Sequence, residues 1–350
     1  MAELPLSALL AAALAPRADL LAGPHDGVVR LFNGFLEGCP DLVVEVYADT
    51  LVILNHARPA ELGAAAVAEA QQFYRGALPW LQAVVVKSRH AETGDPRFSR
   101  QGVLAHGSAP AREIREHGVR YALELLLNQD TSFYPDTRLL RRWALDHLAG
   151  ARVLNTFAYT GSLGVAALAG GARELIQLDR TRGFLEIARA SHALNDHAVG
   201  PQHFWAGDFF AAVARLKRDR ALFDCIFLDP PFFSTSARGT VNLVSESRRL
   251  INKVRPLLAD GGRLVAVNNA LFLPGADYLR TLEELCGDGY LALEEIVPVP
   301  DDCAAPPATR LRELPADPAP FNHATKIAVL RARRKVSAPT PPGTGATPGV

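Results

Sequence analysis

The chain has 350 residues, more than one compact core requires, so we expect two domains. Its 37 lysines and arginines balance 37 aspartates and glutamates, and 49% of its residues are hydrophobic. This composition excludes a mostly disordered chain, a collagen-like chain and a protein whose whole surface attracts nucleic acid. Any nucleic acid would have to be held by a local basic patch.

The N-terminal segment 1–23 contains the apolar run LSALLAAALA. No basic residue precedes this run and it is too short to span a bilayer, so we expect an amphipathic or docking helix rather than a signal peptide. No other segment could span a membrane. The four cysteines form no C-x-x-C pair, so we expect neither a metal site nor a disulfide framework, and a reducing cytoplasm is the expected location.

Residues 24–128 are expected to form a small α+β domain. Strands are predicted at 28–32, in a hairpin over 42–56, at 82–87 and at 119–127, with an Ala-rich helix over 59–78. The stretch 89–118 is polar and irregular, which is typical of a loop or flap.

Residues 129–335 alternate between apolar strands and helices, which predicts a doubly wound, Rossmann-like and mostly parallel sheet with an antiparallel last strand. The strands are expected at 151–155, 174–179, 203–208, 223–229, 263–269, 291–299 and 325–333. A helix is expected over 241–258, and residues 336–350 are expected to form a disordered tail because they are rich in Pro, Gly and Thr. Such sheets bind ligands at the carboxyl ends of their strands.

Three strand ends together predict a nucleoside pocket without a phosphate cradle. The turn from Asn155 to Gly164 is rich in small residues but lacks the G-x-G-x-x-G fingerprint, which argues against a nicotinamide dehydrogenase. Asp179 is placed to accept hydrogen bonds from ribose hydroxyls, although it could instead be a helix cap. Asp208 could accept from an adenine amine, with Phe209 beside the ring.

The fourth strand ends in Asp229-Pro230-Pro231-Phe232-Phe233. The two prolines remove amide donors and leave acceptors, and an aromatic ring at 232 or 233 can stack on a base. We expect this segment to bind a flat nitrogen heterocycle. Asn268 and Asn269 end the fifth strand and would either bind a substrate edge or form a turn.

These motifs resemble the class I S-adenosylmethionine-dependent methyltransferases. NTFAYTGSLG, DPPFFSTS and the VNN strand end are similar to the large-subunit (23S) ribosomal RNA methyltransferases of the guanine-N7 and cytosine-5 group, especially the guanine-N7 branch. RLFNG at 30–34 and LVVEVY at 42–47 resemble the small domain of that group.

The resemblance implies a role for each matched residue. S-adenosylmethionine would be the cofactor, with its methionine part on the turn that includes Asn155, Phe157, Tyr159, Thr160 and Gly161. Asp179 would hold its ribose and Asp208 with Phe209 its adenine. The residues Asp229 to Phe232 would hold the acceptor base, and Tyr134 and Arg138 would lie near the cofactor carboxylate or the substrate entrance.

The expected reaction is methyl transfer to a base nitrogen of RNA, with ribosomal RNA as partner and no metal. Methylation at cytosine C5 would require a nucleophilic cysteine. Cys303 is the one plausible candidate, but we expect it to be a structural or incidental thiol, so methylation of a nitrogen is favoured. A basic patch is expected between Lys87 and Arg142, where ten basic residues face seven acidic ones, and a second over 331–335. Alternatives are a small-molecule or protein nitrogen as acceptor, and a catalytically silent RNA-binding relative.

Overall fold

The computed structural model describes residues 4–91, 95, 97–236, 239–243 and 246–334. Residues 1–3 of the N-terminal segment, residue 335 and the expected disordered tail lie outside this range. Within the described part of the chain, no helix is both long and apolar enough to cross a membrane.

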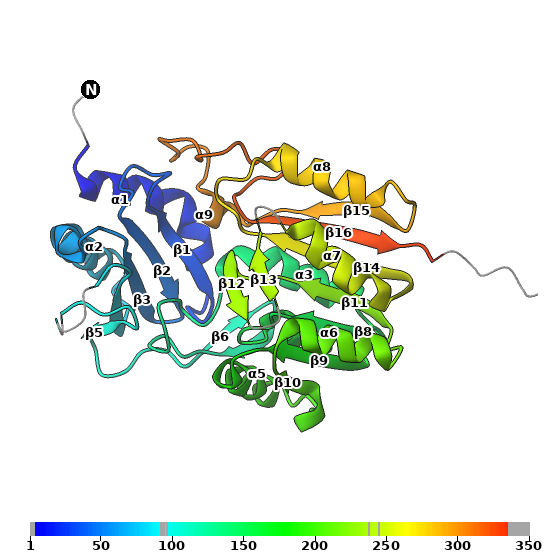
Figure 1. Ribbon diagram of the computed structural model, residues 1–350. Coiled ribbons are helices and arrows are strands. Elements are labelled where there is room, and N and C mark those ends of the chain that lie inside the picture. Colours follow the sequence, from blue (N-terminus) through cyan, green and yellow to red (C-terminus); the bar gives the residue numbers. More distant parts are fainter. Residues whose placement is uncertain (1–3, 92–94, 96, 237–238, 244–245, 335–350) are drawn as a thin grey trace, which may run out of the picture.

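The N-terminal half is built on a five-stranded sheet in the order β1-β2-β3-β4-β5 (Figure 1). Its strands are β1 (Val28–Asn33), β2 (Leu42–Tyr47), β3 (Thr50–Asn55), β4 (Ala83–Ser88) and β5 (Val103–His106). The 3-10 turn η2 (Ala60–Gly63) and helix α2 (Ala64–Ala77) connect β3 to its parallel neighbour β4. Helix α1 (Leu6–Leu14) is followed by the turn η1 (Ala15–Leu21), and Leu10 and Ala13 pack into the same apolar core as β1 and β2. The N-terminal apolar run is therefore a docked helix.

The stretch 89–118 contains more regular structure than the sequence predicts. It contributes β5 and also β6 (Glu113–Glu116), which forms a separate hairpin with β7 (Val119–Ala122). The strand expected over 119–127 is shorter in the structure. It ends at Ala122, which pairs with Glu113, the first residue of the antiparallel strand β6. Short edge strands with alternating charges carry a weak apolar pattern, which is why the sequence alone favoured a loop.

The C-terminal half forms a seven-stranded sheet in the order β10-β9-β8-β11-β14-β16-β15. Its strands are β8 (Arg152–Thr156), β9 (Glu174–Asp179), β10 (Phe204–Ala206), β11 (Phe223–Leu228), β14 (Leu258–Asn268), β15 (Leu291–Val297) and β16 (Lys326–Ala332). The last strand, β16, is antiparallel to both its neighbours. This confirms the expected fold class.

Helices cover both faces of this sheet, so its apolar strands are buried on both sides. One core includes α3 (Arg138–His147) and α4 (Ser162–Ala169), with α5 (Arg182–Leu194) beside α4. The other includes α6 (Phe209–Arg218), α7 (Ser247–Val254) and α8 (Gly275–Cys286). The chain order reverses between the adjacent strands β8 and β11, which creates a crevice at their carboxyl ends.

The helix predicted over 241–258 begins later in the structure than expected. Residues 241–258 were expected to be helical, but β12 (Phe233–Ser236) pairs with β13 (Gly239–Asn242) in an antiparallel hairpin directly after the Asp-Pro-Pro segment. Helix α7 begins only at Ser247 and is followed by the turn η5 (Arg255–Leu257). The hairpin therefore stands next to the strand end where the acceptor site is expected.

Candidate active site

A cavity of about 590 Å³ lies at the carboxyl ends of β8, β9, β10, β11 and β14. This volume is in the range of pockets that hold a small molecule or a cofactor. The residues expected from the sequence that line it are Asn155, Phe157, Tyr159, Thr160, Asp179, Asp208, Phe209, Asp229, Pro230, Pro231, Tyr134 and Asn269. The strand ends that are separate in sequence thus meet around one space.

The loop after β8 is tightly wound. Phe157, Tyr159 and Gly161 have φ angles of 54°, 51° and 77°, which is the left-handed region. Only glycine fits at 161, because a Cβ there would lie 2.5 Å from both the Ala188 Cβ and the Gln177 Nε2. Gly161 itself does not line the cavity, so its contribution is to the shape of the loop.

Gln177 of β9 fixes this loop from behind. Its Nε2 donates to the carbonyl of Gly161 at 3.1 Å, and its Oε1 accepts from Asn155 Nδ2 at 2.8 Å. The Thr160 hydroxyl donates to the carbonyl of Ser132 at 2.6 Å, which ties the loop to the segment entering the sheet. Sequence reasoning missed Gln177, whose signal was a polar residue in an otherwise apolar strand.

Asp179 sits at the end of β9 and holds two backbone amides. Its carboxylate accepts from Tyr159 N and from Thr181 N, each at 2.8 Å. Burial raises the pKa of Asp179 in spite of these hydrogen bonds. The carboxylate therefore orders the first loop and also faces the cavity.

Asp208 and Phe209 are brought to the same cavity by the start of α6. Asp208 is the N-cap of this helix, because its Oδ1 accepts from Ala211 N at 3.0 Å. The ring of Phe209 stacks on that of Phe157 with centroids 4.6 Å apart. These two rings form an apolar wall between the first and third strand ends.

Asp229 follows β11 at the centre of the crevice. Burial, and then the charge of Asp136, raises the pKa of Asp229 from 3.8 to about 7. Pro230 and Pro231 line the cavity beside it, whereas Phe232 is 48% exposed and does not. Of the two rings expected to stack on a base, that of Phe232 thus lies on the surface beyond the cavity wall, and the side chain of Phe233 lies outside the described part of the structure.

Two residues expected at the site serve the scaffold instead. Arg138 does not line the cavity: its guanidinium donates to the Asp302 carboxylate at 2.8 Å and to the carbonyl of Val28 at 2.6 Å. Asn268 is completely buried and donates to the carbonyl of Leu243 and to the Ser247 hydroxyl. A buried guanidinium and a buried amide must satisfy their donors, and here nearby scaffold groups do so.

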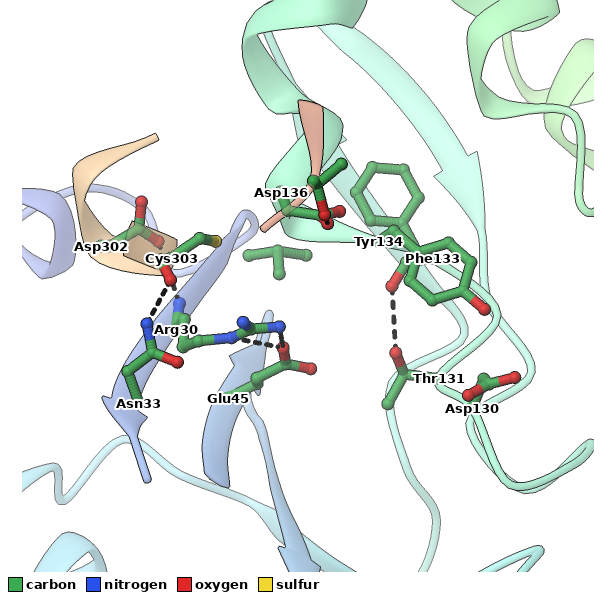
Figure 2. A network of polar contacts seen from close by, with 12 residues as sticks. Arg30, Asn33, Glu45, Asp130, Thr131, Phe133, Tyr134, Asp136, Asp302 and Cys303 are labelled. Atoms are coloured by element: carbon green, nitrogen blue, oxygen red, sulfur yellow. Dashed lines mark hydrogen bonds and ion pairs between the residues drawn. The ribbon is translucent and has the colours of Figure 1, made fainter. Parts of the chain in front are cut away.

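The small domain supplies a residue that the sequence did not assign to the site. Arg30 of β1 lines the cavity, and its Nε and Nη2 donate to Glu45 Oε1 at 2.9 and 2.6 Å. Figure 2 shows this pair between helix α9 (Asp301–Ala304) and the segment carrying Tyr134 and Asp136. Both halves of the chain therefore contribute to the cavity wall.

The cavity is acidic. Among the described residues that line it, five are aspartates and two are arginines: Asp130, Asp136, Asp179, Asp208, Asp229, Arg30 and Arg180. Such a site favours a ligand that carries positive charge over a dinucleotide with its pyrophosphate. A sulfonium with an amino group has this property.

The cysteines do not present a nucleophile to the cavity. Cys303 is fully buried on α9, and burial followed by the charge of Asp302 raises its thiol pKa well above the ordinary value. Cys225 is equally buried within β11. A thiol held protonated reacts slowly, because the thiolate is the attacking species.

Folding buries or pairs part of the basic patch expected between Lys87 and Arg142, whereas Arg100 and Arg112 of the same stretch are exposed. Lys87 is buried and donates to the carbonyls of Gln101 and Asn128. Arg141 is buried against Glu116, and Arg120 pairs with Glu113. Across the second expected cluster, Arg331 pairs with Glu294, and Lys335 lies outside the described residues. Sequence counts do not show which charges are neutralised by folding.

A doubly wound sheet with an acidic cavity at its switch point is typical of Rossmann-like enzymes that bind a nucleoside-containing cofactor. Residues 54–312 match the family model for S-adenosylmethionine-dependent methyltransferases. The chain belongs to this family, whose cofactor is the one expected from the sequence.

Known relatives agree with this membership. The chain is 28% identical over 236 residues to ribosomal RNA large subunit methyltransferase I of Erwinia tasmaniensis, covering 67% of this chain and 59% of that protein. It is 32% identical over 241 residues to ribosomal RNA large subunit methyltransferase K/L of Stutzerimonas stutzeri, covering 65% and 31%. The chain thus spans less than two thirds of the length of these relatives.

A solved structure shares the fold over nearly the whole chain. The crystal structure of SMU.776 complexed with SAH superposes with a TM-score of 0.80 at 19% identity. The match covers 95% of this chain and 83% of that one. It therefore includes both the small N-terminal sheet and the larger sheet.

Proposed function

We propose that this protein transfers a methyl group from S-adenosylmethionine to a base nitrogen of RNA, with large-subunit ribosomal RNA as the target. The observation that carries the proposal is the position of Asp229-Pro230-Pro231 on the same cavity as Asp179 and Asp208. The expected cofactor site and the expected acceptor site then share one cavity.

The residues present fit the cofactor. The loop 155–161 would hold its methionine part, Asp179 its ribose hydroxyls and Asp208 its adenine amine, with Phe209 against the ring. The acidic wall stabilises the positive charge that the bound cofactor carries. When bound, S-adenosylmethionine supplies an electrophilic methyl group.

The protein's own contribution is alignment and exclusion of water. Asp229 and the carbonyl of Pro230 would accept hydrogen bonds from a base, and so aim a ring or exocyclic nitrogen at the methyl group. A nitrogen nucleophile already has a lone pair and requires no covalent help. This agrees with the buried, protonated state of Cys303.

The relatives named as ribosomal RNA methyltransferases support RNA as the substrate class. In this proposal, the domain over 24–128 positions the RNA and the domain over 129–335 carries the cofactor, and the protein acts in the cytoplasm, where ribosomal RNA is available. Arg30 is the contact through which the first domain reaches the site.

Two measurements test the proposal. Mass spectrometry of ribosomal RNA nucleosides should show one methylated base missing from cells without this protein. Asp229→Asn should reduce methyl transfer at least 100-fold while cofactor affinity by calorimetry stays within threefold, and the surface variant Asp277→Asn should match the wild type. An unchanged nucleoside profile together with methyl transfer to a small molecule or protein would show that RNA is not the substrate. Tight cofactor binding without any turnover would indicate a catalytically silent relative.

A further inference from the structure

A groove lined by one sign of charge lies between α6 and α7. It encloses about 460 Å³ and is lined by Lys217, Arg248, Arg249, Asn252 and Lys253. Figure 1 shows both helices on the near face of the larger sheet. Each charged residue in the lining is basic, in a chain whose net charge is zero.

The basic side of the groove is the solvent-exposed side of α7, which is strongly amphipathic. Its buried side, which includes Leu250, Ile251 and Val254, packs into the core, so the remaining side must face solvent. The four lining residues from α7 occupy that exposed side. Exposed helix faces usually mix both signs of charge, and a face that is purely basic is typical of a surface that meets polyanions.

The charges of this groove are only partly neutralised from within. Arg248 pairs with Glu284 on α8, and Arg249 pairs with Glu246. Within the described residues, no carboxylate lies at ion-pair distance from Lys217 or Lys253. Burial, and then the charge of Lys253, lowers the pKa of Lys217. An anion between the two lysines would relieve this repulsion.

One residue of the groove contacts a ring in the wall of the active-site cavity. The Arg249 guanidinium lies over the ring of Phe210 at 5.2 Å from its centroid, and Phe210 lines the cavity. From Phe210, α6 runs to Lys217, a distance of about 10 Å at the helical rise. The basic residues of the groove thus extend along α6 and α7 from beside one ring of the cavity wall.

We propose that this groove binds the sugar-phosphate backbone of the substrate RNA next to the target base. This inference rests on the proposed function and adds the path of the strand. Phosphates are recognised by charge without base specificity, so the groove would fix register while the cavity selects the base.

The test is the double variant Lys217→Gln/Lys253→Gln in the full chain. Its affinity for a ribosomal RNA fragment, measured by fluorescence anisotropy, should fall about 10-fold at physiological salt. The slope of log affinity against log salt should become shallower by about 1.4, because two phosphate contacts on a single strand are lost. The KM for RNA should rise while kcat and cofactor affinity stay within twofold.

The matched control removes two charges elsewhere, as Arg75→Gln/Arg173→Gln, and should bind RNA as the wild type does. If the lysine variant keeps both the affinity and the salt slope while RNA is still methylated, the groove is not the RNA path and the proposed function stands. If the wild-type protein neither binds nor methylates RNA, both proposals fail.

Discussion

The carboxylate of Asp302 accepts a hydrogen bond from Arg138 Nη1 at 2.8 Å, although the two residues are 164 positions apart. The same carboxylate accepts from the backbone N of Arg30 at 3.0 Å. Asp302 of α9 therefore joins β1 of the small domain and α3 of the larger sheet, and Figure 2 shows how it lies beside Arg30. Since Arg30 lines the cavity, this contact also determines where the small domain meets the active site.

Asp302→Ala should destabilise the protein by about 1–3 kcal/mol, because the Arg138 guanidinium and the backbone N of Arg30 lose a buried acceptor, whereas Arg138 keeps Glu116 at 3.5 Å and the carbonyl of Val28. The side chains of Asp302 and Arg138 are 1% and 14% exposed. Urea denaturation would measure the loss. The neighbouring variant Asp301→Ala removes an exposed carboxylate and should change stability by less than about 0.5 kcal/mol. Equal stability of the two variants would contradict the tethering role of Asp302.

Gly161→Ala should lower stability more than Gly150→Ala does, because only at position 161 would the added Cβ meet neighbouring atoms. Both positions have left-handed φ angles, 77° and 72°, but a Cβ at 150 meets nothing within 4 Å. At 161 the added carbon must displace Ala188 or Gln177, so we expect an extra loss of about 1–3 kcal/mol in stability. Cofactor affinity should also fall, because the loop shape changes. Thermal unfolding and calorimetry compare the pair directly, and identical behaviour would contradict the packing explanation.

Asp179→Ala should weaken cofactor binding about 10-fold to 100-fold. The substitution removes the acceptor for two backbone amides and the proposed acceptor for the ribose hydroxyls, each worth about 1 kcal/mol or more. Calorimetry with S-adenosylhomocysteine would measure this. Glu186→Ala removes an exposed carboxylate from the adjacent helix and serves as the control. An unaltered affinity for Asp179→Ala would remove this residue from the proposed cofactor site.

The pH dependence of activity should follow Asp229. With a pKa of about 7 in the ligand-free protein, its carboxylate is formed as pH rises through 7, so kcat/KM for RNA should rise over this range. In Asp229→Asn the remaining activity should be flat between pH 6 and about 8. A wild-type profile that is also flat would show that ionisation of Asp229 does not limit catalysis.

The raised pKa of Asp229 makes the folded protein less stable as pH rises, whereas activity should increase. The folded protein binds a proton at Asp229 that the unfolded chain has lost above pH 4, so the free energy of unfolding falls as pH rises from about 4 to about 7. Asp229→Asn removes this loss and should stabilise the ligand-free protein by roughly 1–2 kcal/mol at pH 8, after allowance for water that partly reaches the side chain. Urea denaturation at pH 5 and pH 8 measures it, and a destabilised variant at pH 8 would contradict the raised pKa.

The sequence by itself determined the larger sheet and most of its strand ends, because alternating apolar segments and turn residues are local properties. Asp179, Asp208 and Asp229 follow directly from that pattern, since parallel strands bring their carboxyl ends to one edge. Tertiary structure alone decided which charged side chains remain available at the surface. In the sequence, three cations look like surface residues, but each is buried or half-buried against partners distant in the chain: Arg138, Lys87 and Arg141. The same folding exposes one basic side of α7 and leads Arg30 into the cavity. Burial and charge pairing depend on these long-range contacts, which no local pattern encodes.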